Sequence, residues 1–95
     1  MKLTAAEIGV LTRAMREVSV HARFDQFRVR LHPILTNAEL QDVQCNAAFL
    51  VLGGAMAQGE RDGDLIFVRA CEDLLDRVRA AFPSYERPRY GGRPG

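Results

Sequence analysis

The 95-residue chain has no long hydrophobic run. Its longest unbroken apolar stretch is residues 47–57, which is 11 residues, whereas about 20 are needed to cross the hydrocarbon core of a bilayer. The N-terminus also lacks the basic and then hydrophobic segments of a secretory signal. We therefore expect a cytoplasmic protein without a membrane span.

An excess of charge of one sign is also missing. The sequence carries 13 basic and 12 acidic residues, a net charge of +1, and this balance gives no general attraction to nucleic acid or membranes. The distribution is less even, because residues 1–32, 33–64 and 65–95 carry net charges of +3, −4 and +2. In a self-associated protein, the basic ends of one copy can lie against the acidic middle of another. Lys2 is the only lysine beside twelve arginines, a bias that indicates a GC-rich prokaryotic or phage genome.

The chain has only two cysteines, Cys45 and Cys71. If it folds into a helical hairpin that turns near Arg61, the two residues are offset by roughly 9 Å along the helix axis, at 1.5 Å per residue. A disulfide requires Cα atoms within about 7 Å. The spacing therefore predicts two reduced, buried thiols that pack as small apolar groups.

No catalytic signature is present. The sequence contains no glycine-rich phosphate loop, no Gly-x-Ser-x-Gly elbow and no Cys/His motif. His21, Asp25 and His32 lie near one another in the sequence, but the further ligands of a zinc site are missing. Asp62 and Asp64 lack the remaining spacing of a calcium loop, so a turn and helix cap is the favoured interpretation. We expect no enzyme activity, no cofactor and no metal site.

Helical signals fill most of the chain. Residues 36–39 read Thr-Asn-Ala-Glu, a capping box that predicts a helix over 37–58. Two apolar stripes run along this helix, so it is expected to be central and buried on more than one side. One stripe is Leu40, Val43, Ala47, Leu50, Val51 and Gly54, and the other is Cys45, Phe49, Leu52 and Met56. The pair Gly53 and Gly54 predicts the close approach of a neighbouring helix.

Residues 59–64 read Gly-Glu-Arg-Asp-Gly-Asp and predict a helix stop at Gly59, a polar turn and a new N-cap. The next helix is expected over 64–82, ended by Pro83. Its buried stripe is Phe67, Cys71, Leu74, Leu75, Val78 and Phe82. On the opposite face, Arg69, Asp73 and Arg77 are spaced to form ion pairs.

The N-terminal part begins with a second capping box, residues 4–7, which opens an amphipathic helix over 4–22. Its stripe is Ile8, Leu11, Met15, Val18 and Ala22. A second apolar set lies nearly opposite at about 100° per residue, and its members are Val20, Phe24, Phe27 and Leu31. We therefore predict a break near 22–25 and a separate short segment over 24–31. Residues 27–31 alternate like a strand, but no second strand is available, so a short helix that ends at Pro33 is favoured.

Residues 83–95 contain three prolines, three glycines and no apolar periodicity, which predicts a flexible tail. Residues 1–82 are then expected to form a single domain. The predicted fold class is all-α: a small helical bundle of three main helices (about 4–22, 37–58 and 64–82) plus the short segment over 24–31.

These features favour a small non-enzymatic protein-interaction module. It would be an adaptor, inhibitor or regulator that binds another protein, and a phage or mobile element is one candidate source. A homodimer is predicted, because the central helix has more apolar surface than two short neighbours readily cover. The candidate self-association residues are Phe49, Leu52 and Met56.

The alternative is a nucleic-acid-binding regulator. Residues 3–9 resemble the start of the first helix of a DNA-binding helix-turn-helix, although residues 10–22 contain no Gly, Pro or Asn for its turn. Arginines near the N-terminus and an Arg/Tyr/Gly tail can contact nucleic acid or an acidic protein by charge and stacking. The candidate contact residues are Arg13, Arg16, Arg23, Arg28, Arg30, Arg87, Arg89 and Tyr90. A solvated charged face and a solvated tail are the simpler interpretation.

Overall fold

The computed structural model describes residues 1–18 and 25–83. These residues form four α-helices and one short 3₁₀ helix: α1 (Ala5–Val18), α2 (Asp25–Asn37), η2 (Asp42–Gln44), α3 (Cys45–Asp62) and α4 (Leu65–Ala81). Within the described ranges there is no named strand, only an isolated bridge between Lys2 and Glu39. The all-α bundle is confirmed, and the segment for which helix and strand competed is a helix, α2.

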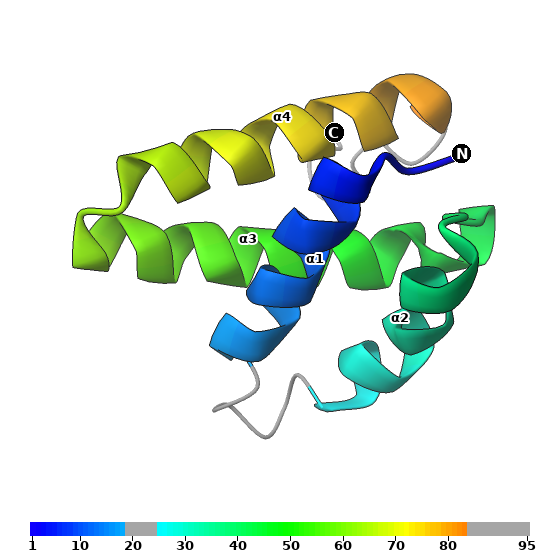
Figure 1. Ribbon diagram of the computed structural model, residues 1–95, viewed down its shortest axis with the longest axis horizontal. Helices are drawn as coiled ribbons and strands as arrows, with labels where there is room; N and C mark the ends of the chain where they lie inside the picture. The colour runs from blue at the N-terminus through cyan, green and yellow to red at the C-terminus, as the bar shows by residue number, and fades with distance from the viewer. Residues whose placement is uncertain (19–24, 84–95) are drawn as a thin grey trace, which may run out of the picture.

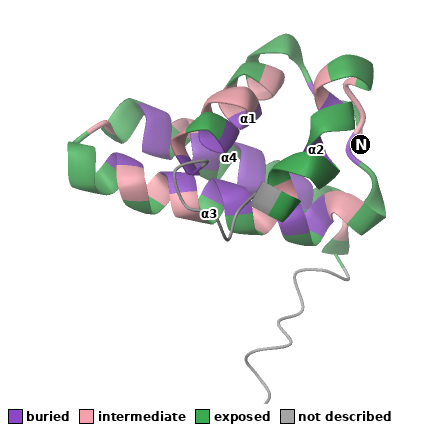
Figure 2. Cartoon of the chain, turned by 90° about the horizontal axis from the view of Figure 1, so that it is seen from below, coloured by how far each residue is buried: buried purple, intermediate pink, exposed green. Residues whose placement is uncertain are grey.

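Helix α3 is the central element and contacts each of the other three helices. Figure 1 shows α3 and α4 side by side and antiparallel, with α1 crossing them and α2 packed toward the N-terminal end of α3. Figure 2 colours the chain by burial and shows buried residues in each of the four helices. No helix in the described parts of the chain is long and apolar enough to span a membrane.

The core takes side chains from all four helices. Most of the predicted stripes are buried, and the largest fully enclosed side chains include Leu11, Leu31, Ile34, Leu52, Val51 and Val78. Two members of the predicted central stripe instead lie on the surface, since Val43 is 74% exposed and Leu50 is 42% exposed. Val43 belongs to η2 rather than α3, so it does not follow the helical register that the sequence pattern assumed.

The capping box at the start of α1 forms as predicted. The Thr4 hydroxyl accepts a hydrogen bond from the Glu7 N–H at 3.1 Å, and the Glu7 carboxylate accepts one from the Thr4 N–H at 2.8 Å. At the start of α4, the Asp64 carboxylate accepts from the Phe67 N–H at 3.2 Å. Both caps satisfy backbone donors that have no partner within their helix.

The capping box predicted at residues 36–39 does not form. Helix α2 continues to Asn37, and the chain then turns at Ala38, whose φ of 57° is left-handed. The Asn37 side chain accepts from the Glu39 N–H at 3.0 Å, which closes this turn. The predicted start of the central helix at residue 37 is therefore wrong, since α3 begins at Cys45.

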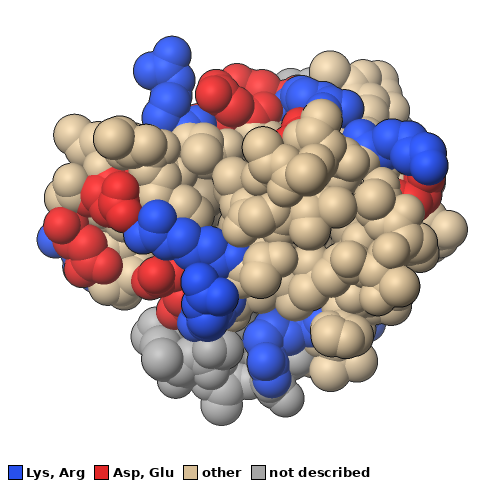
Figure 3. All heavy atoms as spheres, viewed as in Figure 1, with Lys and Arg blue, Asp and Glu red and all other residues tan. Residues whose placement is uncertain are grey.

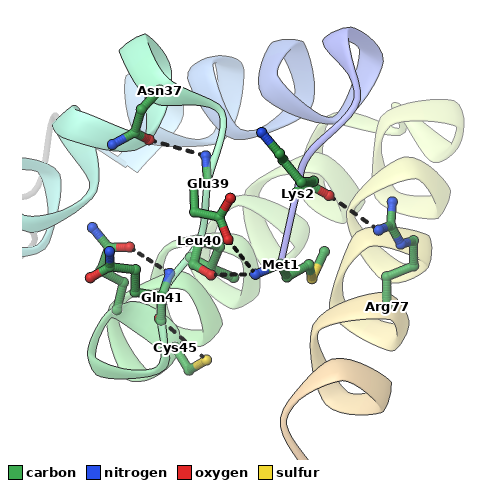
Figure 4. Close-up of polar contacts among 9 residues, drawn as sticks. Met1, Lys2, Asn37, Glu39, Leu40, Gln41, Cys45 and Arg77 are labelled. Atoms are coloured by element: carbon green, nitrogen blue, oxygen red, sulfur yellow. Dashed lines mark hydrogen bonds and ion pairs between the residues drawn. The ribbon is translucent and has the colours of Figure 1, made fainter.

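A tertiary contact explains why Glu39 does not cap a helix (Figure 4). The Met1 nitrogen donates to the Glu39 carboxylate at 3.0 Å and to the Leu40 carbonyl at 2.9 Å. The backbone of the same segments pairs through the Leu3 N–H and the Ala38 carbonyl at 2.9 Å. These long-range bonds outweigh the local capping pattern, so the turn after α2 is built around the N-terminal segment.

The ion pairs predicted along α4 form only in part. Arg69 and Asp73 are paired at 3.7 Å on the exposed face. Arg77 points away from them, because its guanidinium binds the Glu7 carboxylate at 2.5 Å and the Lys2 carbonyl at 3.2 Å. Arg77 thus joins the last turns of α4 to the start of α1, and Figure 4 shows its contact with the Lys2 carbonyl.

Pro33 does not end the second helix, contrary to the prediction. Helix α2 continues past it, although proline removes one backbone donor and normally breaks a helix interior. Leu31, two residues before Pro33, and Ile34, directly after it, are completely buried against the core, while His32 and Pro33 are exposed. Burial of the flanking side chains holds this turn helical despite the missing hydrogen bond.

The helix stop predicted at Gly59 is also wrong, because α3 continues to Asp62. Gly63 ends it with a φ of 75°, a left-handed conformation that favours glycine. The Gly63 N–H donates to the Glu60 carbonyl, and the Asp64 N–H donates to the Gly59 carbonyl at 2.9 Å. This is a Schellman ending, and it sets the short turn into α4.

Gly59 provides a close helix approach of the kind that the sequence predicts at Gly53 and Gly54, whereas Gly53 does not. A Cβ atom on Gly59 would lie 2.9 Å from Cγ2 of Val68 on α4, whereas a Cβ on Gly53 would meet nothing within 4 Å. Gly53 is exposed and Gly59 is buried. The two helices of the hairpin therefore pack tightly at their closed end, next to the turn.

Candidate functional site

The two thiols are buried and do not form a disulfide, as predicted. Cys45 and Cys71 are free cysteines with no exposed surface. Burial raises the pKa of each thiol to about 11. Both side chains therefore stay protonated at neutral pH, and neither is placed to act as a nucleophile.

The acidic turn acts as a cap, which agrees with the interpretation favoured by the sequence. Asp64 caps α4, and Asp62 accepts hydrogen bonds from the Gln58 side-chain amide at 3.2 and 3.4 Å. Among residues 1–18 and 25–83, no group of three or more His, Cys, Asp or Glu side chains is arranged to hold a metal ion. His21, one of the three residues considered for zinc, lies outside the described ranges, and His32 is exposed on α2.

Arg13, a candidate contact residue, forms contacts within the fold. Its guanidinium lies 2.5 Å from the Asp64 carboxylate and 3.6 Å from that of Glu17, and it stacks 4.0 Å from the centroid of the Phe67 ring. These contacts join α1 to the turn between α3 and α4. Arg13 therefore joins α1 to the turn before α4. Its side chain is still 40% exposed, so its role as a contact residue stays a prediction.

This ion pair gives a pH prediction. The Arg13 hydrogen bond, followed by that from the Phe67 N–H, holds the pKa of the Asp64 carboxyl below its ordinary value. The charged form thus stabilises the fold above the ordinary Asp pKa of about 4, and this stabilisation is lost as pH falls through the lowered pKa. Asp64→Asn keeps a capping side chain but removes the charge, so we expect a less stable protein at pH 7 whose stability falls less on acidification. Urea unfolding at a series of pH values measures both effects.

The matched control is Asp76→Asn. Asp76 pairs with Arg79 at 3.1 Å on the exposed side of α4, and such surface pairs contribute little to stability. The control should follow the wild-type pH dependence. An Asp64→Asn protein with the wild-type acid response would show that the carboxylate does not stabilise the fold.

The other candidate arginines do not form one strip. Arg16 is exposed on α1, whereas Arg28 and Arg30 are exposed on α2, which is a separate helix. The break predicted near 22–25 falls almost wholly on residues outside the described ranges. Arg23, Arg87, Arg89 and Tyr90 lie outside the described residues.

A hollow near these residues lies between α1 and α2. It has a volume of about 360 Å³ and opens to solvent, and we call it the α1–α2 groove. It is lined by Met15 of α1 and by Arg28, Val29, His32 and Pro33 of α2. Val29 is 67% exposed. The groove thus combines apolar side chains with an arginine and a histidine.

A second hollow of about 310 Å³ is lined by Arg30, Val43 and Gln44. The Gln44 side-chain amide donates to the Arg30 carbonyl at 3.2 Å, which ties η2 to α2. Val43 is the second exposed valine of this region. The outward side of α2 therefore carries exposed apolar groups and positive charge together.

The three predicted self-association residues differ in how far they are buried. Leu52 has no exposed surface and lies inside the core of the single chain. Phe49 and Met56 are half-buried and pack against that core, and the Arg79 guanidinium lies 6.0 Å from the centroid of the Phe49 ring. Leu52 is therefore unable to contact a second copy without unfolding, and only the outer parts of Phe49 and Met56 are accessible.

No protein family, curated protein or solved structure matches the chain. The site must be interpreted from its own residues.

Two of the groove residues were singled out from the sequence: Arg28 as a candidate contact and Met15 as a core residue. The sequence did not predict that Val29, His32 and Pro33 form a common surface. The signal was present in the alternation of residues 27–31. Once α2 is known to be a helix, Val29 falls on the side opposite Leu31 and Ile34 and must face solvent.

Proposed function

We propose that the protein is a non-enzymatic interaction module, acting as an adaptor, inhibitor or regulator, that binds another protein through the α1–α2 groove. The observation that supports this proposal is the exposure of Val29 beside Arg28 and His32 in an open hollow. An exposed apolar surface with a charged rim is typical of a protein interface. A reducing, cytoplasmic location is part of the proposal and agrees with the two free thiols.

The groove favours a partner segment that is both apolar and acidic. Helix α2 contains two arginines, one histidine and one acidic residue, Asp25 at its start, so its net charge is +1 with the histidine neutral. This charge favours an acidic partner over a basic one. A short amphipathic helix with leucines on one face and glutamates beside them has this chemistry. Its apolar face would cover Met15, Val29 and Pro33, and its carboxylates would lie near Arg28 and His32.

A homodimer belongs to the same proposal. The described surface carries five large exposed apolar side chains, which are Val29, Val43, Leu50, Leu65 and Ile66. Burial of such groups against a second copy stabilises a small domain that encloses a limited core of its own.

The groove predicts a clear response to one substitution. Val29→Asp places a carboxylate in the groove without touching the core, so binding of an acidic, leucine-rich helical peptide should weaken at least about tenfold. The same peptide with lysines in place of its glutamates should bind more weakly to the wild-type protein. Fluorescence anisotropy of labelled peptides measures both affinities.

Val43→Asp is the matched control, because Val43 is similarly exposed but lines the other hollow. It should bind the acidic peptide as the wild type does. If both valine variants bind alike, or if the lysine peptide binds as tightly as the acidic one, the groove is not the binding surface.

A nucleic-acid-binding regulator is the second candidate, favoured by the positive charge of α2. Arg28 and Arg30 are exposed on a helix whose one acidic residue is Asp25, at its first position. Binding through phosphate contacts would weaken steeply as salt rises. A mobility-shift assay over a salt series separates this function from protein binding.

A further inference from the structure

A second apolar feature of the surface lies at the turn between α3 and α4. Leu65 and Ile66 begin α4 and are 67% and 86% exposed. Residues 60–66 also contain three acidic residues and a single arginine. We call these residues the α3–α4 tip. Because Arg13 pairs with Asp64, the net negative charge of the tip comes from Glu60 and Asp62 against Arg61, and it lies beside the apolar pair.

The tip is held in place by the rest of the fold. Asp64 binds the Arg13 guanidinium at 2.5 Å, and the turn itself ends α3 at Gly63 in a defined left-handed conformation. Arg61, the only basic residue of the tip, donates to the Gln58 side chain at 2.7 Å. A surface that is already ordered loses little conformational entropy when it binds.

The α3–α4 tip and the α1–α2 groove are complementary. The tip offers exposed aliphatic side chains among carboxylates, and the groove offers apolar walls beside Arg28 and His32. In Figure 1 the turn between α3 and α4 lies at the left end of the molecule, and α2, which supplies most of the groove residues, lies on the right. Acidic side chains gather at the tip end of the molecule, at the left of Figure 3. One copy therefore does not bring its own tip into its own groove.

We infer that the α3–α4 tip of one copy docks in the α1–α2 groove of a second copy. This inference rests on the proposed function, because the receiving groove is the same, and it names a second copy of this chain as an occupant. A two-fold arrangement of two antiparallel copies makes the contact twice and closes the assembly as a dimer. Ile66 is then buried against Val29 of the other copy, and the carboxylates of the tip lie near its Arg28.

Two substitutions of opposite charge, one in the tip and one in the groove, test the contact between the two copies. Ile66→Lys places a positive charge at the tip, against a basic groove, and Val29→Asp places a negative charge in the groove, against an acidic tip. Each variant alone should dimerise at least about tenfold more weakly than the wild type. An equimolar mixture should recover dimers, because one of its two contacts is native and the other joins the introduced lysine to the introduced aspartate. Sedimentation and light scattering measure the mass, and native mass spectrometry with one variant labelled by ¹⁵N identifies the mixed dimer.

Val43→Asp should dimerise as the wild type does, and circular dichroism should show that every variant is folded. The inference is wrong if the wild type stays at the 10.6 kDa of one chain at all concentrations, if the single variants dimerise normally, or if mixing forms no mixed dimer. The acidic-peptide titration separates the two proposals. Peptide binding that depends on Val29 without self-association would overturn the tip contact alone, whereas the loss of both would overturn the groove.

Discussion

Replacing Leu52 by alanine is expected to destabilise the protein by about 2–5 kcal/mol, because the substitution empties a fully buried site at the centre of α3. Helix α3 contacts all three other helices, so the cavity cannot be closed by moving one neighbour alone. A small domain has a total stability of about 5–15 kcal/mol, and the melting temperature should therefore fall by about 10 °C or more. Urea unfolding and thermal melts followed by circular dichroism measure the change.

Leu50→Ala is the matched control, two residues away on the same helix. Leu50 is 42% exposed, so its truncation should change stability by less than about 1 kcal/mol. Equal losses for the two variants would contradict the observed orientation of α3. A larger loss at Leu50 would place the buried face of α3 on the wrong side.

The contrast between these leucines shows how far the apolar pattern predicted the fold. Both belonged to stripes on the predicted central helix, and the prediction that this helix is buried on more than one side is correct for Leu52, Val51 and Ala55. Periodicity identifies the faces of a helix but does not say which face lacks a neighbour. The exposure of Leu50 follows from how few helices are available to surround α3.

Local chemistry predicted helix ends well where no distant residue interferes. The Thr4 capping box and the Asp64 N-cap both form, since their partners lie three residues along the chain. The similar pattern ending at Glu39 fails because the Met1 nitrogen, 38 residues away, takes its carboxylate. A contact of that sequence separation carries no local signal, so only the folded chain reveals it.

The candidate site was predicted less completely than the fold. Arg28 and Arg30 were identified by charge, and they do lie exposed on α2. The groove itself depends on α2 continuing through Pro33, which the sequence argued against. The exposure of Val29 and the nearness of Met15 depend on how α1 packs against α2, a tertiary arrangement that spacing along one helix does not specify.

Gly59→Leu is expected to destabilise the protein by about 1–3 kcal/mol, although leucine is a better helix former than glycine by roughly 1 kcal/mol. The reason is the close approach of α3 and α4 at the end of the hairpin. A Cβ atom at this position would lie 2.9 Å from Cγ2 of Val68 and 3.4 Å from Cδ2 of Phe67. Val68 is β-branched and buried, so it has few other rotamers, and the helices must separate. Urea unfolding measures the loss.

Gly53→Leu, on the same helix, is expected to stabilise the protein. Gly53 is exposed, and a Cβ atom there would meet nothing within 4 Å, so only the gain in helix propensity remains and stability should rise by about 0.5–1 kcal/mol. The two substitutions are chemically identical and differ only in what faces them. If both variants were stabilised, α3 and α4 would have space for a side chain at Gly59, and the prediction would be wrong. Separation of α3 from α4 at this point would also shift the adjoining tip, so Gly59→Leu should weaken self-association while Gly53→Leu leaves it unchanged.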